Sequence, residues 1–134
     1  MAKIVDIEGI GPKFGEKLGA AGIKTTEALL KHAANKKGRQ DLAAKTGLDT
    51  GQLLEWVNRA DLMRIKGVGT QYSDLLEAAG VDTVPELAQR NAKNLFAKLQ
   101  EVNGQKKLVR QLPTAEQVEG WVKTAKSLKR MVEY

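Results

Sequence analysis

The chain uses one stretch twice, as IEGIGPKFGEKLGAAGIKTTEALL at residues 7–30 and as IKGVGTQYSDLLEAAGVDTVPELA at residues 65–88. A shift of 58 residues aligns the Gly-x-Gly turns, the Ala-Ala-Gly triplets and most apolar positions between them. A second match, DTGQLLEWVNRA at residues 49–60 with TAEQVEGWVKTA at residues 114–125, needs a shift of 65. This period is too long for the common solenoids. We therefore predict a duplicated helical domain, with residues 1–61 as the first repeat and residues 62–134 as the second.

The signals inside each copy are those of helices. Pro12 stands where a helix begins, and Thr70 at the matching position offers a hydroxyl cap. Gly22 and Gly80 follow apolar runs of helical period and fit left-handed helix stops. Thr83 opens a capping-box pattern. Because no alternating strand pattern of useful length is present, we predict an all-α chain with four or five short helices per copy.

Two further helices carry the tryptophans. Thr114 opens a second capping box ahead of Trp121, and Trp56 occupies the equivalent place in the first copy. Both tryptophans stand inside apolar stripes, so we expect them in the core. The chain has only six aromatic residues, which argues against binding of single strands by base stacking.

The composition excludes several classes of protein. The absence of cysteine removes disulfides and thiolate metal sites and favours a cytoplasmic location. No apolar run approaches the about 20 residues of a membrane helix, so we expect no membrane partner. His32 is the one histidine and no cysteine accompanies it, so we expect no transition-metal site. Neither Ser73 nor Ser127 has the context of a catalytic nucleophile, and we expect no enzyme activity and no cofactor.

Positive charge collects in the C-terminal third of the sequence. The net charge is +6, and residues 90–134 carry ten basic against four acidic residues. A focused basic surface indicates a nucleic-acid partner. Short clusters elsewhere offer the same chemistry or form only a solvated surface; they are Lys36, Lys37 and Arg39, then Lys106, Lys107 and Arg110, and a series formed by Lys123, Lys126, Lys129 and Arg130 on the last helix.

The glycine turns have two explanations. In the structural one, the glycines supply positive φ and close approach, while Ile10 and Val68 point inward and pin the turn. Small residues one turn later, Gly15 and Ser73, leave space for a neighbouring helix. In the functional one, backbone N–H groups at the positive end of a helix bind phosphate.

The pattern around Gly9-Ile10-Gly11-Pro12-Lys13, and around Gly67-Val68-Gly69, resembles the helix-hairpin-helix motif. That resemblance implies a SAM-like helical fold that grips the duplex backbone without reading sequence, and it permits a monovalent cation at the hairpin carbonyls. Over nearly its whole length the chain is similar to an uncharacterised bacterial family of tandem helix-hairpin-helix proteins. That second resemblance implies a fold and no particular activity.

The two turns differ in charge. The first is followed by Lys13 and Lys17, whereas the second is followed by Thr70, Gln71 and Asp74. The spacing of 58 residues is also wider than in the familiar paired hairpin domain, so a shared grip on one duplex does not follow. We expect phosphate contacts mainly at the first turn, and an architectural role for the second.

Two functions are consistent with the sequence, and the net charge and the resemblance favour the first. The first is sequence-independent binding of a DNA or RNA duplex, with backbone contacts at Gly9, Ile10, Gly11, Gly67 and Gly69 aided by the basic side chains named above. The second is a protein-interaction or scaffold role, with an acidic protein as one possible partner class and with purely structural turns.

Overall fold

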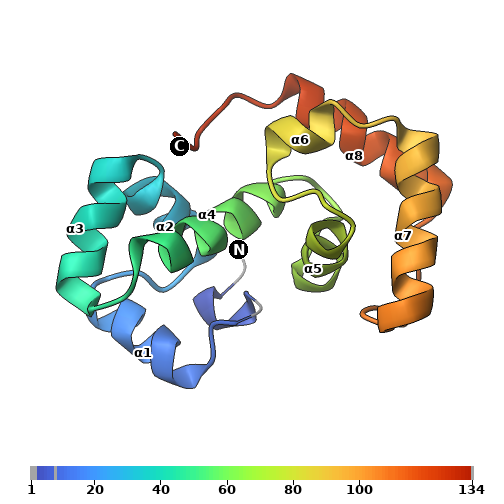
Figure 1. Cartoon of the computed structure of the whole chain (residues 1–134). Coiled ribbons are helices and arrows are strands. Elements are labelled where there is room, and N and C mark those ends of the chain that lie inside the picture. The colour runs from blue at the N-terminus through green and yellow to red at the C-terminus, as the bar shows by residue number, and fades with distance from the viewer. Residues whose placement is uncertain (1–2, 8, 134) are drawn as a thin grey trace. The chain divides into compact units, whose positions relative to one another are not determined.

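The computed structural model describes residues 3–7 and 9–133, and their secondary structure is helical apart from one isolated bridge between Lys3 and Thr25. The prediction of an all-α chain is confirmed. The chain divides into two compact units, which we describe separately (Figure 1). Unit 1 holds residues 1–61 together with 130–134, and unit 2 holds residues 62–129.

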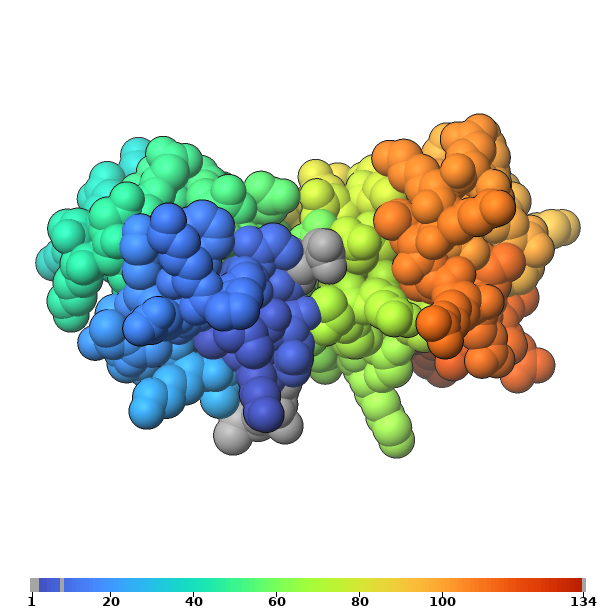
Figure 2. Space-filling view, turned by 90° about the horizontal axis from the view of Figure 1, so that it is seen from below, coloured from blue at the N-terminus to red at the C-terminus, as the bar shows by residue number. Residues whose placement is uncertain are grey.

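Unit 1 begins with a short 3-10 helix and continues with four α-helices. The elements are η1 (Ile4–Asp6), α1 (Pro12–Ala20), α2 (Thr26–Ala33), α3 (Lys36–Thr46) and α4 (Thr50–Leu62), whose last residue already belongs to unit 2. α1 packs against η1, and α2 packs against α3. Leu18, Leu29, Leu53 and Trp56 are almost completely buried. In Figure 2 the blue surface of η1 and α1 covers much of the visible face of this unit.

Unit 2 contains four α-helices around one apolar core. They are α5 (Thr70–Ala78), α6 (Val84–Ala88), α7 (Ala92–Lys106) and α8 (Ala115–Ser127). α8 packs against both α6 and α7, and α5 packs against α7. Leu76, Leu95, Leu99 and Trp121 belong to this core. Both tryptophans are therefore buried, as the apolar stripes predicted.

The helix stops predicted at Gly22 and Gly80 are confirmed. Both glycines have positive φ, +88° and +92°. After α1, the N–H of Ile23 donates to the carbonyl of Leu18 at 2.8 Å. After α5, the N–H of Val81 makes the same bond to Leu76 at 2.9 Å. These six-to-one bonds are those of the Schellman motif, which satisfies carbonyls at the end of a helix.

The predicted caps at Thr83 and Thr114 are confirmed, and the predicted cap at Thr70 is wrong. The hydroxyls of Thr25, Thr83 and Thr114 each accept the N–H three residues on, at 3.1–3.2 Å. Thr114 also forms the reciprocal half of a capping box with Gln117. Thr70 does not cap α5, because the helix starts one residue earlier than predicted. Gly69 is the N-cap and Thr70 is the first helical residue.

The second copy has nine more residues from the start of α7 to the start of α8 than the first copy has from α3 to α4, and two fewer from the start of α6 to the start of α7, which gives its seven additional residues. α7 has 15 residues where α3 has 11, and residues 107–114 connect it to α8 where three residues connect α3 to α4. α3 ends at Gly47 with φ +77°, and α7 ends at Lys107 with φ +50°. Lys107 is thus a lysine in a left-handed conformation that usually favours glycine.

The C-terminal segment packs on unit 1. Arg130–Tyr134 are grouped with residues 1–61, whereas the sequence repeat predicted a second domain running from 62 to 134. The difference arises because α8 ends at Ser127 and the chain then continues without helix. Local patterns do not encode where such a segment docks.

Candidate functional site

The first glycine turn, residues 9–11, is held by backbone bonds and by a tryptophan. Gly9 has φ +94°, and a Cβ built on it would lie 3.4 Å from Nε1 of Trp56. Ile10 is buried, and its N–H donates to the carbonyl of Ile7 at 3.0 Å. The ring of Phe14 lies 5.5 Å from that of Trp56. The element before this turn is the three-residue η1, shorter than the helix that a hairpin between two α-helices implies.

The second glycine turn, residues 67–69, repeats this geometry in unit 2. Gly67 has φ +90°, and its built Cβ would lie 3.3 Å from Nε1 of Trp121. Val68 is buried and its N–H donates to Ile65 at 3.0 Å. The ring of Tyr72 lies 5.3 Å from that of Trp121. The structural explanation of the glycines and of the apolar residue between them therefore holds at both turns.

The small residues after the turns are small for different reasons. A Cβ on Gly15 would lie 2.4 Å from Cγ1 of Val5 in η1, so the 3-10 helix occupies the space that a side chain would need. Ser73 is almost completely buried, and its hydroxyl donates to the carbonyl of Thr70 at 2.9 Å. This burial leaves Ser73 without access to a substrate.

The helices that follow the two turns begin differently from most others in the described part of the chain. α1 and α5 start after Gly11 and Gly69, and neither has a side-chain cap. In α2, α3, α6, α7 and α8, a side-chain oxygen accepts an N–H of the first turn. The first N–H groups of α1 and α5 therefore keep capacity for an outside acceptor, at the end where the helix dipole is positive.

At the first turn the cations come from α1 itself. Lys13 and Lys17 are exposed and stand one helical turn apart, on one face of α1. Glu16 is exposed on the same helix. Glu8, the other acid close to this turn in sequence, lies outside the described residues. Lys13 thus remains available to a ligand at the N-terminus of α1, whereas Lys17 lies in the last turn of this helix.

At the second turn the cation comes from a distant loop. A recess of about 690 Å³ is lined by Gly67, Gly69, Thr70, Gln71, Tyr72, Arg110 and Gln111. Arg110 is exposed and lies in the long connection between α7 and α8. The sequence shows Arg110 as part of a basic cluster, but no local pattern links it to this turn, because it comes 41 positions after Gly69.

The connection that carries Arg110 is anchored on both sides of it. Before Arg110, the N–H of Val109 donates to Oδ1 of Asn103 at 2.9 Å, and Nδ2 of Asn103 donates to the carbonyl of Val109 at 3.1 Å. After Arg110, the hydroxyl of Tyr72 donates to the carbonyl of Gln111 at 3.0 Å. These bonds fix the backbone of Arg110 beside the start of α5.

The other two residues of this basic cluster lie at the end of α7. Lys106 and Lys107 are exposed, and a lysine at this end complements the helix dipole. Lys106 lines a second open recess together with Asp74 and Glu77. The acids of α5 thus lie near Lys106, and the recess of the second turn is lined by Arg110.

The basic cluster of α3 is split by the fold. Lys36 and Lys37 are exposed at the start of α3, but Arg39 is only 4% exposed. Nη1 of Arg39 donates to the carbonyls of Ala33 and Ala34 at 3.0 and 2.9 Å. In this structure the guanidinium is therefore a structural group, and the expectation of a surface contact at Arg39 does not hold.

The basic series at the end of the chain is not one helical face. α8 ends at Ser127, so Lys129 and Arg130 lie beyond it and leave Lys123 and Lys126 on the helix. The carbonyl of Lys129 accepts a bond from Nη2 of Arg64 at 3.0 Å. The spacing that suggested a continuous stripe assumed a longer helix than the structure has.

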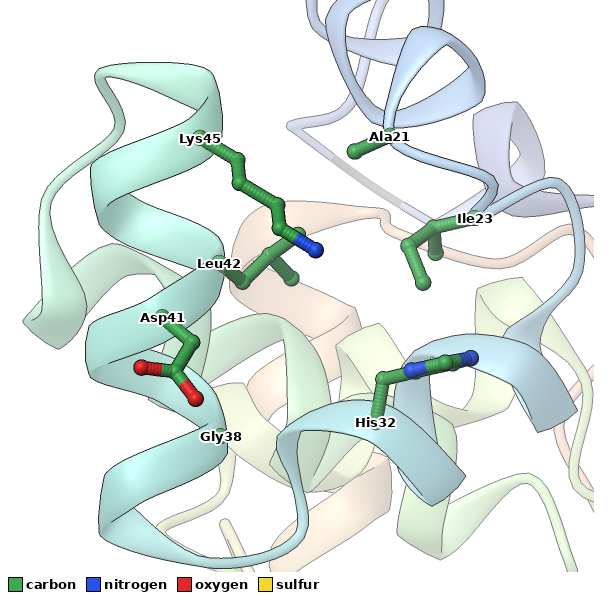
Figure 3. A pocket seen from close by; sticks show the side chains of 7 residues that line it. All are labelled: Ala21, Ile23, His32, Gly38, Asp41, Leu42 and Lys45. Carbon is green, nitrogen blue, oxygen red and sulfur yellow. The ribbon is translucent and has the colours of Figure 1, made fainter.

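His32 lies at a small recess of unit 1, with a volume of about 160 Å³ (Figure 3). Ala21, Ile23 and Leu42 supply apolar lining, and Asp41 and Lys45 project from α3 beside them. Among residues 3–7 and 9–133, no three His, Asp or Glu side chains are grouped in a way that could hold a metal ion. The same residues contain no helix both long and apolar enough to cross a membrane.

Residues 8–128 match the family described as Domain of unknown function (DUF4332). The chain belongs to this family. The match covers both glycine turns, all of α1 to α8 and the loop that carries Arg110. No curated protein and no solved structure matches the DUF4332 chain.

Proposed function

We propose that this DUF4332 protein is a non-catalytic binding module that holds the phosphate backbone of duplex nucleic acid without reading its sequence. One observation carries the proposal. The two helices that begin after glycine turns lack side-chain caps, and an exposed cation lies near each start, Lys13 at α1 and Arg110 at α5. Lys17 follows Lys13 one turn further along the same face of α1. Uncapped N–H groups at a helix start suit a phosphate oxygen.

The proposal includes a fold assignment. We infer that both units are helix-hairpin-helix, SAM-like repeats, since the turns share positive φ, a buried apolar residue and a tryptophan contact. It also changes the part given to the second turn. On sequence grounds that turn was architectural, but Arg110 gives it the positive side chain that its own helix lacks.

The direct test is a titration of a duplex at increasing salt, starting near about 50 mM. Phosphate contacts predict that the logarithm of the binding constant falls linearly with the logarithm of salt concentration. Lys13→Gln with Lys17→Gln should weaken binding and reduce this slope by about two, and Arg110→Gln should reduce it by about one. The effect should be the same for duplexes of unrelated sequence, because backbone contacts carry no sequence information.

Matched controls separate these sites from the general charge of the protein. Lys24→Gln with Lys31→Gln makes the same charge change in unit 1, and Lys93→Gln makes it in unit 2, all at exposed positions outside the turns. If the controls weaken binding as much as the turn variants, the turns are not the site. No binding at low salt would overturn the proposal and favour the protein-interaction role.

A further inference from the structure

The small recess of unit 1 that contains His32 has a floor of core side chains and a rim of polar ones. Ile23 and Leu42 are 1% and 5% exposed, so the apolar floor is part of the packed core of this unit. His32, Asp41 and Lys45 are exposed at the rim. The recess therefore offers an apolar surface together with an imidazole, a carboxylate and an ammonium group.

The packing of α2 against α3 determines how these groups are arranged. A Cβ on Gly38 would collide with the backbone carbonyl oxygen of His32, so the glycine lets the end of α2 lie against α3. Asp41 and Lys45 stand one turn apart on α3, and His32 faces them across the recess (Figure 3). The ammonium group of Lys45 points into the recess toward the side of Ile23, away from the carboxylate of Asp41 (Figure 3). The two opposite charges are thus presented at separate places around one recess.

Unit 2 has the matching helix but different side chains at the matching positions. α3 and α7 both follow a capping asparagine, Asn35 or Asn91. The residues three, six and ten positions after Asn91 stand where unit 1 has its glycine, acid and lysine, and they are Asn94, Ala97 and Glu101. The repeat therefore does not need Asp41 and Lys45 in order to fold, and a ligand specific to unit 1 would account for the pair.

We propose that this recess binds a free aliphatic α-amino acid. The ammonium group of Lys45 and an imidazole N–H of His32 donate to the carboxylate of the ligand, and the carboxylate of Asp41 accepts from its ammonium group. The branched side chain of the ligand lies on Ile23 and Leu42. The recess of about 160 Å³ suits a small ligand, since a cavity of about 150 Å³ holds a benzene ring.

Charge complementarity selects this class of ligand over simpler ones. A fatty carboxylate or an inorganic phosphate would be repelled by Asp41, and an alkyl amine would be repelled by Lys45. A zwitterion with an apolar side chain matches both charges and the apolar floor. None of the residues that line the recess belongs to a glycine turn, so this site is independent of the proposed duplex binding.

The test is a titration of ¹⁵N-labelled full-length protein with L-valine and with L-leucine, followed by the amide shifts of residues 21–23 and 38–45. We expect saturable shifts with a dissociation constant on the order of 1 mM, as suits a small ligand at an open recess. D-valine, isovalerate and isobutylamine change the handedness, the ammonium group and the carboxylate of L-valine in turn. Each should bind at least about tenfold more weakly, because each loses a charged hydrogen bond.

The outcome of these titrations decides the ligand class. The absence of saturable shifts with both L-valine and L-leucine would overturn the site. Isovalerate, isobutylamine or D-valine binding as tightly as L-valine would overturn the assignment to an amino acid.

Variants locate the site on the protein. Asp41→Asn and Lys45→Gln each remove one charge at an exposed position of α3 and should weaken binding of L-valine at least about tenfold. Glu27→Gln and Lys36→Gln make the same charge changes at exposed positions that do not line the recess, and they should leave binding unchanged. The amide spectrum of each variant without ligand shows whether unit 1 is folded. A folded Asp41→Asn or Lys45→Gln variant that binds as tightly as the unchanged chain overturns the proposal, and so does an equal loss in the control variants.

Discussion

The two units pack in the same way at the glycine turn, but they bury different kinds of side chain at the third helix. Gly9 and Gly67 have φ within a few degrees of each other, and each lies against the indole of its own unit's tryptophan. The third helices, α3 and α7, both start after a capping asparagine, Asn35 or Asn91. Four residues later unit 1 has Arg39 and unit 2 has Leu95, and both side chains are buried.

This difference shows which positions the fold requires and which it leaves open. A buried leucine is satisfied by apolar neighbours, and Leu95 has them in the core of unit 2. A buried guanidinium needs acceptors, and Arg39 finds carbonyls in α2 and in the C-terminal segment. The same helix position therefore closes an apolar core in one unit and holds a distant segment in the other.

The largest loss of stability is expected when an arginine is placed in unit 2 at Leu95, the position that matches Arg39. Leu95→Arg places a guanidinium in an apolar core without the carbonyls that serve Arg39, and we expect a loss of about 4 kcal/mol or more in the stability of unit 2. Hydrogen exchange across α7 and α8 measures it. Lys93→Arg, at an exposed position of the same helix, should change little.

The reciprocal change, Arg39→Leu, should cost less, about 1–3 kcal/mol, because it removes hydrogen bonds to carbonyls and introduces no charge. It should also raise hydrogen exchange at the amide of Glu133. Equal losses for Leu95→Arg and Arg39→Leu would show that the two positions are not environments of opposite polarity.

An intermediate loss of stability is expected from substitutions at the glycine turns, where the two units have the same geometry. Gly9→Ala and Gly67→Ala each force an alanine into positive φ and push its Cβ toward an indole, and we expect each to cost about 1–3 kcal/mol. Urea unfolding followed by tryptophan fluorescence measures both. Gly11→Ala and Gly69→Ala are the controls, because neither residue has positive φ and a Cβ there meets no atom within 4 Å.

A matched response of Gly9→Ala and Gly67→Ala would strengthen the view that the units are copies of one repeat. A loss confined to one of the two would break it, since the indole contact would then be required in only one unit.

The smallest effect is expected at the ends of α3 and α7. Lys107→Gly relieves a lysine with φ +50° and should stabilise unit 2 by about 0.5–1 kcal/mol. Gly47→Lys places a lysine at the matching end of α3 and should destabilise unit 1 by about 1 kcal/mol. The urea concentration at the midpoint of unfolding measures both changes, provided that the dependence of the unfolding free energy on urea concentration is unchanged. A destabilising Lys107→Gly would mean that its side chain makes contacts that outweigh the strain.

Much of the fold could be predicted from sequence because its signals are local. These signals act within one helical turn: a proline begins a helix, a glycine ends one, and a threonine hydroxyl accepts the N–H three residues later. The predictions at Pro12, Gly22 and Thr114 are confirmed. The prediction that Thr70 caps α5 was wrong because Gly69 and Thr70 are adjacent and both residue types are common at the N-cap position. The apolar spacing around Trp56 and Trp121 also predicted their burial.

The candidate site was less predictable because its distinctive contacts are long-range. Arg110 reaches the second turn through bonds from Asn103 and Tyr72, and no local pattern links those residues. The sequence predicted Arg39 to be one of three surface cations. It shows the charge of the residue, but not the backbone carbonyls that accept its hydrogen bonds in the folded chain. The sequence shows the charge of each basic cluster, but the exposure of its side chains depends on segments that are distant in the chain.

The bond from Arg39 to Glu133 spans 94 residues of sequence. Unit 2 is continuous in sequence, so all of its residues are added to the growing chain before residue 130. Unit 1 has the opposite history, because its first helices are made early and its contacts with Glu133 form only after residue 133 has been added. Contacts of such long separation close late in folding. The half of the protein that is synthesised first is therefore the half that is completed last.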